Sequence, residues 1–541
     1  MALDTRQNLG SFDYIIIGAG TAGCLLANRL SKDPSSNVLL LEAGGSDWSP
    51  MIHIPLLAGV AYFDKSINWG YDTEPEAHLK DRKLHWPRGK VIGGSSSING
   101  MMYIRGDSYD YDGWRQLGLD GWDYASVLPY FKRSECNLEK KESKYHGSDG
   151  PWRIKRCTSD NPLYQAFFDS CSDSGYQMTD DFNGVNQEGF QWHDFNIADG
   201  RRQSTAVAFL KPSLKRKNLH VEKRAHVTKI IMEGKKAVGV EFEKFGTKST
   251  FMANREVILS SGAINSPSIL MHSGIGDANQ LRKLGININH NLPGVGKNLQ
   301  DHLGVYVQHE CLEPVTMYKW FRPDRAVSMM LNALLFRKGI ATSLPLEAGM
   351  FAKSNPNLDR PDIHILMVPG LNLSASQKGQ EKHGFLIHVY QLRPESRGEI
   401  VINSNNPHDK PLMRPNYFSA EPDLEVTREG VKIIKNIFSQ DPFKPFLGKP
   451  ISPDKFEQSD SEIEDWVRSS AETVFHPTSS CKMSLSSDPT GVVDNSLKVH
   501  GVDNLRVVDA SIMPTMLSAN LNAGAIMIGE KGSDMILKEN F

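Results

Sequence analysis

FDYIIIGAGTAGCLLANRL, residues Phe12 to Leu30, is the stretch that decides the fold. A short apolar run ends where Gly18, Gly20 and Gly23 follow in G-x-G-x-x-G spacing, and a helical pattern with leucines on one side comes next. In such a unit the first glycine permits a tight turn, the second lets the backbone approach a pyrophosphate, and the third lets the helix pack on the strand. The phosphate then lies at the positive end of the helix. The stretch therefore predicts a nucleotide-binding strand–turn–helix unit.

A second apolar run strengthens this prediction. NVLLLEAGG, residues 37–45, ends its apolar part in Glu42, at the spacing of an acid that hydrogen-bonds a ribose hydroxyl. Strand, helix, second strand and acid together favour an ADP-containing dinucleotide over a glycine-rich turn that binds nothing. FAD and NAD share the adenosine diphosphate half, so the fingerprint leaves the choice between them open.

Two longer motifs lie further along the chain. HWPRGKVIGGSSSINGMMYIRGDSYDYDGW begins at His85 and carries a Gly-Gly-Ser-Ser run between a basic Pro-Arg-Gly-Lys and an asparagine. SGAINSPSILMHSGIG spans residues 261–276. Both resemble, residue for residue, the signatures of the glucose–methanol–choline (GMC) oxidoreductases. Three shorter runs resemble further landmarks of that family, so the likeness extends from about residue 12 to about residue 538: GVGKNLQDH (294–302), PESRGEI (394–400) and RVVDASIMP (506–514).

The resemblance implies the fold class and the domain organisation. We expect a mixed α/β protein in which a Rossmann-like FAD-binding domain is interleaved with a substrate domain built on an antiparallel sheet with helices. The implied FAD-binding segments are residues 1–159, which include a flavin-covering loop, 216–304 and 471–541. The implied substrate-domain segments are residues 160–215 and 305–470.

The resemblance also implies FAD and the residues that hold it. A glycine-rich loop at 93–96 would let backbone N–H groups approach the pyrophosphate and the flavin without obstruction. Some family members attach FAD through a histidine just before the asparagine of this loop, whereas this chain has Ile98, so we expect non-covalent FAD. The implied cofactor-binding residues are Gly18, Gly20, Gly23, Glu42, Arg88, Gly93, Gly94, Ser95, Ser96, Asn99, Val227, Asp509 and Ala510.

VFHPTSSCKM, residues 474–483, places His476 five residues before Cys481 in a segment rich in proline, serine and threonine. From the residues alone this histidine is a metal ligand, half of a Cys/His nucleophile pair, a packed core residue, or a base that serves a bound cofactor. A zinc or iron site needs three or four ligands and the segment offers two, which disfavours a metal. A nucleophile pair needs a spatial contact that sequence does not report.

The family resemblance implies that His476 is the base that takes the alcohol proton at the flavin. The partner position, His or Asn in the family, falls by register on Asn520 in MLSANLNAGAIMIGEKGSDMI, with Asn522 as the alternative. A neutral imidazole is suited to accept a proton at physiological pH, and an amide N–H can stabilise a developing alkoxide.

We therefore expect an FAD-dependent enzyme that oxidises a primary alcohol to the aldehyde by proton abstraction and hydride transfer to flavin N5. Its motifs are most similar in wording to bacterial alcohol and choline dehydrogenases, and a quinone-type electron acceptor is expected. The alternatives are an oxygen-using alcohol oxidase, a lyase or decarboxylase on the same flavin fold, and a non-catalytic flavoprotein. Glu347 is a candidate partner for a substrate cation, and four aromatic residues could form a cage around a quaternary ammonium group: Tyr318, Trp320, Phe321 and Phe475.

Composition bounds the partners and the location. The chain has 541 residues, a net charge of −2, 39% apolar and 23% charged residues, which is typical of a soluble globular protein of roughly two to four domains and disfavours nucleic acid as a partner. Six scattered cysteines without a CxxC pair, and no signal-peptide pattern, predict a cytoplasmic protein without a disulfide framework. Peripheral contact with the inner membrane stays open, and the oligomeric state is not predicted.

Overall fold

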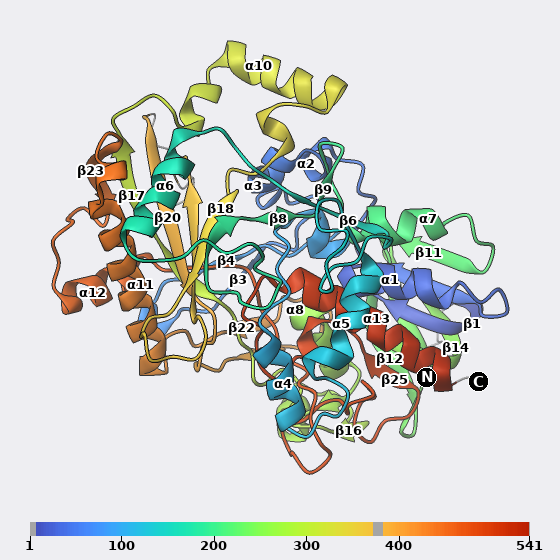
Figure 1. The fold of residues 1–541 in the computed structure, drawn as a ribbon. Helices are drawn as coiled ribbons and strands as arrows, with labels where there is room; N and C mark the ends of the chain where they lie inside the picture. Colours follow the sequence, from blue (N-terminus) through green and yellow to red (C-terminus); the bar gives the residue numbers. More distant parts are fainter. Residues whose placement is uncertain (1–6, 372–381, 540–541) are drawn as a thin grey trace.

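Two seven-stranded sheets organise the chain, and each is backed by its own cluster of buried apolar side chains (Figure 1). The computed structural model describes residues 7–371 and 382–539. The chain crosses between the two sheets several times, so residues far apart in sequence meet where the sheets face each other.

The first sheet contains the predicted nucleotide-binding unit. Five of its strands run parallel in the order β11-β2-β1-β14-β25, and β13 and β12 continue from β14 as an antiparallel meander. All five residues of β2 are buried, as expected of a central parallel strand that is covered on both faces. The strands are β1 (Gln7–Ile17), β2 (Val38–Glu42), β11 (Leu219–Lys223), β12 (His226–Glu233), β13 (Lys236–Lys244), β14 (Thr247–Leu259) and β25 (Leu505–Val507).

Two helices from opposite ends of the chain pack side by side on this sheet. α1 (Thr21–Leu30) follows the glycine turn, and α13 (Leu521–Glu539) is the last helix (Figure 1). Gly529 lets the backbones approach, because a Cβ there would lie 3.3 Å from the Cα atom of Ala22. The guanidinium of Arg29 binds the buried carboxylate of Glu530, with an Nε–Oε2 distance of 2.9 Å. The Thr21 hydroxyl donates to the side-chain oxygen of Asn522 at 2.8 Å, so the N-terminal end of α13 lies beside the glycine turn.

The second sheet is antiparallel throughout, in the order β23-β17-β20-β19-β18-β7, with β24 beside β17. All eight residues of β20 are buried, because α11 (Glu421–Ser439) covers one face of the sheet and the rest of the molecule covers the other. The apolar residues of α11 recur every three or four positions and turn inward. The strands are β7 (Gly189–Trp192), β17 (Leu303–Cys311), β18 (Ala348–Ala352), β19 (Ile363–Val368), β20 (Gly384–Gln391), β23 (Leu447–Ser452) and β24 (Glu472–Thr473).

Shorter elements complete the described part of the chain. The remaining helices are α2 (Pro50–His53), α3 (Ala58–Ala61), α4 (Ser108–Gln116), α5 (Tyr124–Ser134), α6 (Pro162–Asp173), α7 (Lys211–Ser213), α8 (Gly262–His272), α9 (Ala278–Lys283), α10 (Pro323–Leu331) and α12 (Asp460–Ser470). The remaining strands are β3 (Tyr71–Asp72), β4 (His85–Trp86), β5 (Glu135–Asn137), β6 (Trp152–Arg156), β8 (Asp194–Phe195), β9 (Ile197–Ala198), β10 (Arg201–Arg202), β15 (Ile275–Gly276), β16 (His290–Asn291), β21 (Glu399–Val401) and β22 (Leu412–Arg414).

The predicted fold class is confirmed, since one sheet is mainly parallel with a glycine turn at its centre and the other is antiparallel with helices on it. Among the helices of residues 7–371 and 382–539, none is long and apolar enough to cross a bilayer. The division into five domain segments stays a prediction.

Candidate active site

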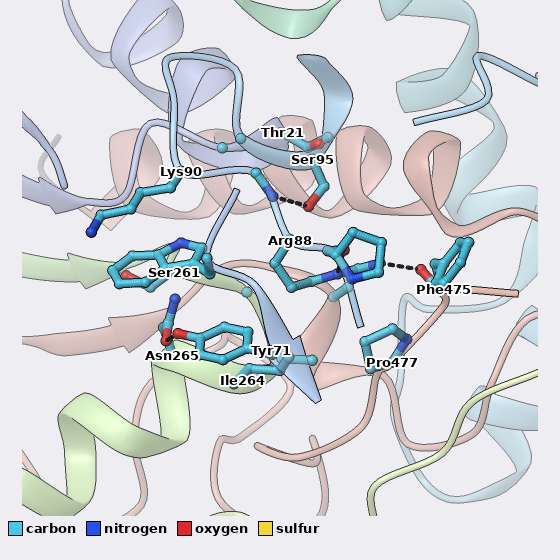
Figure 2. Close-up of a pocket in the computed structure, with 18 of the residues that line it drawn as sticks. Thr21, Tyr71, Arg88, Lys90, Ser95, Ser261, Ile264, Asn265, Phe475 and Pro477 are labelled. Atoms are coloured by element: carbon cyan, nitrogen blue, oxygen red, sulfur yellow. Dashed lines mark hydrogen bonds between the residues drawn. The ribbon is translucent and has the colours of Figure 1, made fainter. Parts of the chain in front are cut away.

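A cavity lies between the two sheets and brings together most of the residues that the sequence singled out (Figure 2). It encloses about 590 Å³, which is within the range of ligand sites. Of the predicted cofactor-binding residues, Gly23, Gly93 and Ser96 lie behind its wall. The others line it: Gly18, Gly20, Glu42, Arg88, Gly94, Ser95, Asn99, Val227, Asp509 and Ala510.

At one end of the cavity the wall is backbone packed on backbone. Gly18 has a φ of +97°, and a Cβ atom there would lie 2.7 Å from the carbonyl oxygen of Ser260. A Cβ on Gly23 would lie 1.9 Å from the carbonyl oxygen of Gly18, and one on Gly94 would lie 2.7 Å from the Cα atom of Gly20. Side chains at these positions would push the turn, the glycine-rich loop and α1 apart. Without side chains at these three positions, a pyrophosphate could come close to the peptide groups of the turn and the start of α1.

Glu42 ends β2 at the same end of the cavity. One carboxylate oxygen accepts from the backbone N–H of Ala19 at 2.9 Å, and the other accepts from that of Gly44 at 2.8 Å. Burial raises the pKa of Glu42 to about 7. The two backbone hydrogen bonds fix the carboxyl group in the position from which a ribose hydroxyl is bound in dinucleotide folds.

The residues behind and beside the glycine-rich loop hold it in shape. The Ser96 hydroxyl donates to the carbonyl oxygen of Gly93 at 2.6 Å. The buried guanidinium of Arg202 donates to the backbone carbonyl of Asn99 at 2.6 Å and to its side-chain oxygen at 2.8 Å. Asp509, which lines the cavity, holds a different segment, the first turn of α8, because its carboxylate accepts from the Gly262 N–H at 2.9 Å and from the Ser266 hydroxyl at 2.6 Å.

FAD fits these residues on two structural grounds. The glycine cradle is one, because Cβ atoms would fill the space along the turn. The other is a pair of buried polar atoms, Ser260 Oγ and Asn522 Nδ2, which have no hydrogen-bond partner among the described residues although Ser260 and Asn522 both line the cavity. Buried polar groups are normally satisfied, so such atoms indicate a polar ligand at this wall.

Arg88 fixes the segment that leads to His476. Its Nη2 atom donates to the carbonyl oxygen of Phe475 at 2.6 Å (Figure 2). Phe475 has a φ of +66°, a conformation that a bulky residue adopts only when the surroundings hold it there. The backbone N–H of His476 in turn donates to Asp301 Oδ1 at 2.7 Å. Both hydrogen bonds act on the peptide group that joins Phe475 to His476, so they fix the backbone on the N-terminal side of the histidine.

A second histidine sets the tautomer of His476. The Nε2 atom of His302 lies 3.0 Å from the carbonyl oxygen of Leu392, and since a carbonyl only accepts, this nitrogen carries the proton. Burial lowers the pKa of His302 to about 4, so its ring is neutral and its Nδ1 atom is an acceptor. The Nδ1 atom of His476 lies 2.9 Å away and donates to it. In neutral His476 the unprotonated nitrogen is therefore Nε2.

The unprotonated nitrogen of His476, Nε2, lies beside Asn520, and both residues line the cavity. The Asn520 amide Nδ2 lies 3.2 Å from His476 Nε2, and Asn520 Oδ1 is buried with no partner among the described residues. Asn522 lies elsewhere, because its side-chain oxygen accepts from the Thr21 hydroxyl at 2.8 Å at the start of α1. Of the two asparagines that the sequence left open, Asn520 is thus the neighbour of the histidine.

Burial lowers the pKa of His476 well below the ordinary histidine value, and the nearby His302 and the Arg88 charge lower it further. The neutral ring is consequently the form present at physiological pH. Only the neutral form can accept a proton, so this protonation state is compatible with the predicted role of His476 as a base.

The wall around His476 is aromatic and aliphatic. Tyr306 from β17 and His388 from β20 stack with ring centroids 4.3 Å apart. The cavity's acidic lining residues are Glu42, Asp409 and Asp509, and the first and last belong to the dinucleotide end. The other residues of this wall are Tyr62, Ile98, Met102, Leu346, Leu366, Val368 and Phe475.

Glu347 and the candidate aromatic cage do not join this wall. Leu346 lines the cavity, whereas the buried carboxylate of its neighbour Glu347 accepts from the hydroxyl groups of Tyr164 and Ser343. Among Tyr318, Trp320, Phe321 and Phe475, only Phe475 is a cavity residue. No group of three or more His, Cys, Asp or Glu side chains in the described residues could hold a metal ion.

Several of these residues were not found from the sequence. His302 lay in the GVGKNLQDH run, but nothing local indicated that it meets His476. No motif marks Arg202, Tyr306 or His388. Their strands are brought to the cavity only by the tertiary fold, which the sequence around them does not report.

Two family models, both described as GMC oxidoreductase, match residues 12–304 and 394–529. The mitochondrial choline dehydrogenase of Mus musculus is 45% identical over 534 residues, which cover 97% of this chain and 89% of that protein. The oxygen-dependent choline dehydrogenase of Staphylococcus xylosus is 46% identical over 531 residues, which cover 97% of this chain and 95% of that protein.

Two solved structures of similar shape are oxidases. Pyridoxine 4-oxidase from Mesorbium loti superposes with a TM-score of 0.89 at 29% identity, covering 98% of this chain and 99% of that one. Formate oxidase from Aspergillus oryzae superposes with a TM-score of 0.92 at 27% identity and the same coverage.

Proposed function

This chain belongs to the GMC oxidoreductase family and is an FAD-dependent alcohol oxidoreductase, and from that premise we propose that it oxidises an uncharged primary alcohol to the aldehyde. One observation carries the proposal: the unprotonated Nε2 atom of a neutral His476 faces a buried cavity beside the Asn520 amide. A base and a hydrogen-bond donor at one point are what removal of a hydroxyl proton needs.

We assign the proton step to these two side chains. His476 Nε2 accepts the hydroxyl proton while His476 Nδ1 keeps its hydrogen bond to His302. The Asn520 amide N–H, now 3.2 Å from Nε2, donates to the substrate oxygen as negative charge develops there. Bound FAD supplies the acceptor for the hydride that leaves the alcohol carbon. General-base assistance of this kind contributes ~10²–10⁴-fold to the rate.

The same proposal assigns the cofactor contacts. Backbone groups around Gly18, Gly20 and Gly94 would hold the pyrophosphate, and Glu42 would bind a ribose hydroxyl. The flavin half would lie toward Ser95 and Asn99. Ile98 offers no nucleophilic atom, which supports non-covalent binding of FAD.

The charges near His476 support an uncharged substrate. The Arg88 guanidinium acts on His476 electrostatically, and it stays protonated at neutral pH. The carboxylate that could have balanced a substrate cation, Glu347, is hydrogen-bonded to Tyr164 and Ser343 outside the cavity. Asp301 also lies near His476, but behind the cavity wall, where its oxygens accept from the His476 N–H and from the hydroxyl groups of Tyr417 and Thr473. Among the residues that line this end, a cationic alcohol would meet the Arg88 charge and no carboxylate. Choline is the second candidate, favoured by the names of the relatives and by the π faces of Tyr62 and Phe475.

The electron acceptor is a quinone in this proposal, with molecular oxygen as the alternative, and the location is cytoplasmic with peripheral contact to the inner membrane. Oxygen is supported by the relatives that are named oxygen-dependent choline dehydrogenases and by the structural neighbours that are named oxidases. The two acceptors differ in what reoxidises the enzyme after the alcohol has reacted, so the assignment of His476 and Asn520 is the same for both.

The test is an anaerobic visible spectrum of the FAD-loaded protein with choline or with 3,3-dimethylbutan-1-ol, which has the same shape but carbon in place of the charged nitrogen. We expect loss of the oxidised flavin band with the uncharged alcohol at a rate constant at least about tenfold above that with choline. Faster reduction by choline would make choline, rather than an uncharged alcohol, the favoured substrate. If neither these nor other primary alcohols bleached the flavin, the proposed reaction would be wrong. Admitting air or a soluble quinone then separates the acceptors.

A further inference from the structure

α10 and the π-helical turn after it (Asn332–Phe336) stand out from the body of the molecule (Figure 1). A helix that faces water normally turns polar side chains outward. Here the outward side is apolar, and contiguous exposed apolar side chains mark interaction sites. We call the following six residues, each between 46% and 68% exposed, the apolar patch: Phe321, Val327, Leu331, Leu334, Leu335 and Phe336.

The inner side of the same helix is anchored without the patch. Met329 and Ala333, one turn apart, are buried and pack in a small core with Ile54 and Ala341. This core lies next in sequence to cavity-lining positions, since Ala341 precedes Leu346 by five residues. The apolar patch therefore has no role in holding α10 on the protein, and it lies on the outside of an element that flanks the substrate end.

Basic residues flank the patch at both ends. Residues 319–338 contain Lys319, Arg322, Arg325, Arg337 and Lys338 and a single acid, Asp324, which gives this segment a net charge of +4 in a chain whose overall net charge is −2. An apolar face between basic ends is the pattern of a helix that lies in a membrane interface, where the apolar side chains enter the acyl region and the basic groups meet lipid phosphates.

We propose that the apolar patch docks the enzyme on the surface of a bilayer that contains anionic phospholipids. The helix lies on the membrane rather than across it, because α10 and the turn after it are too short to span one. Apolar burial supplies the attachment, and the flanking basic residues supply the preference for anionic lipid. This inference assigns a surface to the peripheral membrane contact proposed above, and it holds whichever alcohol and acceptor the enzyme uses.

The experiment is cosedimentation of the FAD-loaded protein with vesicles of phosphatidylcholine alone or of phosphatidylcholine mixed with phosphatidylglycerol. We expect binding to the mixed vesicles, weaker binding to the neutral ones, and a loss of this preference as salt is added.

Two variants and a control distinguish docking through the apolar patch from nonspecific hydrophobic binding to vesicles. Leu335→Asp combined with Phe336→Asp should weaken binding to both kinds of vesicle by at least about tenfold. Arg337→Glu combined with Lys338→Glu should weaken binding to the mixed vesicles by about tenfold or more and leave the neutral ones nearly unaffected. Val185→Asp, which changes an 81% exposed apolar residue in another part of the chain, should bind as the parent does. The flavin spectrum and the rate of flavin reduction by alcohol in solution should be unchanged in all three.

Three results would overturn the proposal. One is that the parent protein does not sediment with mixed vesicles, and another is that the Leu335/Phe336 variant binds as well as the Val185 variant. The third is that the parent is a dimer in solution and the Leu335/Phe336 variant a monomer, with neither binding vesicles, which would make the patch a contact between two copies of this chain.

Discussion

The dinucleotide end of the cavity is made of backbone, whereas the substrate end is made of side chains. Gly18, Gly23 and Gly94 bring peptide groups together at distances that no Cβ would permit. Around His476, by contrast, the geometry depends on the side chains of Arg88 and His302, which act from other parts of the chain through single hydrogen bonds. The structure of the dinucleotide end depends on close backbone packing, whereas that of the substrate end depends on which nitrogen atoms carry protons. Substitutions should therefore damage the two ends in separable ways.

The largest effect is expected from Gly23→Ala. The added Cβ would lie 1.9 Å from the carbonyl oxygen of Gly18, so the turn and α1 must move apart. We expect a protein purified without the visible flavin band, which a visible spectrum checks. Gly113→Ala is the matched control, because Gly113 lies in α4 with nothing within 4 Å of the new atom. An FAD-loaded Gly23→Ala protein would break the proposed distinction between the two ends.

His476→Ala should act on the substrate end alone. Loss of the base should lower the rate constant of anaerobic flavin reduction by ~10²–10⁴-fold, while FAD content stays that of the parent. Stopped-flow absorbance and the ratio of bound FAD to protein measure the two quantities. If the substitution removed FAD as well, the histidine would have to be counted with the dinucleotide end, and an unchanged rate would remove it from the reaction.

A smaller effect tests how the histidine is positioned. His302→Ala removes the acceptor for His476 Nδ1–H and frees the ring to expose its protonated nitrogen, and outer partners of a functional histidine are typically worth about 10–100-fold. His302→Asn retains an amide oxygen that can accept the same hydrogen bond, so it should recover part of the rate. Equal loss in both variants would indicate that His302 acts through packing rather than through the tautomer.

The same difference explains what could be predicted from the sequence. The turn at Gly18 and the acid at Glu42 follow one another within one βαβ unit, so local spacing predicted their proximity, and the structure has both on the cavity wall. The GMC resemblance added His476 and Asn520, and their contact agrees with it, although their roles stay proposals. The resemblance also implied the interleaved order of the two sheets.

The remainder of the site depends on pairings that sequence does not show. His302 reaches His476 because β24 pairs with β17, strands more than 150 residues apart in the chain. Leu346 and Glu347 are neighbours that point to different surroundings, and only the fold decides that the leucine faces the cavity. The apolar residues of α10 carry no motif, and only the fold shows which of them face outward.

The pH dependence of anaerobic flavin reduction by an uncharged primary alcohol tests the central claim most directly. A group whose pKa is lowered keeps its neutral form to lower pH, so activity is present above that pKa and is lost as pH falls through it. Because burial, His302 and Arg88 lower the pKa of His476, we expect a rate constant that is flat at neutral pH and declines only below about 6.5, with no such decline in His476→Ala. A half-maximal rate above pH 6.5, or the same decline without His476, would contradict a neutral, buried histidine as the base.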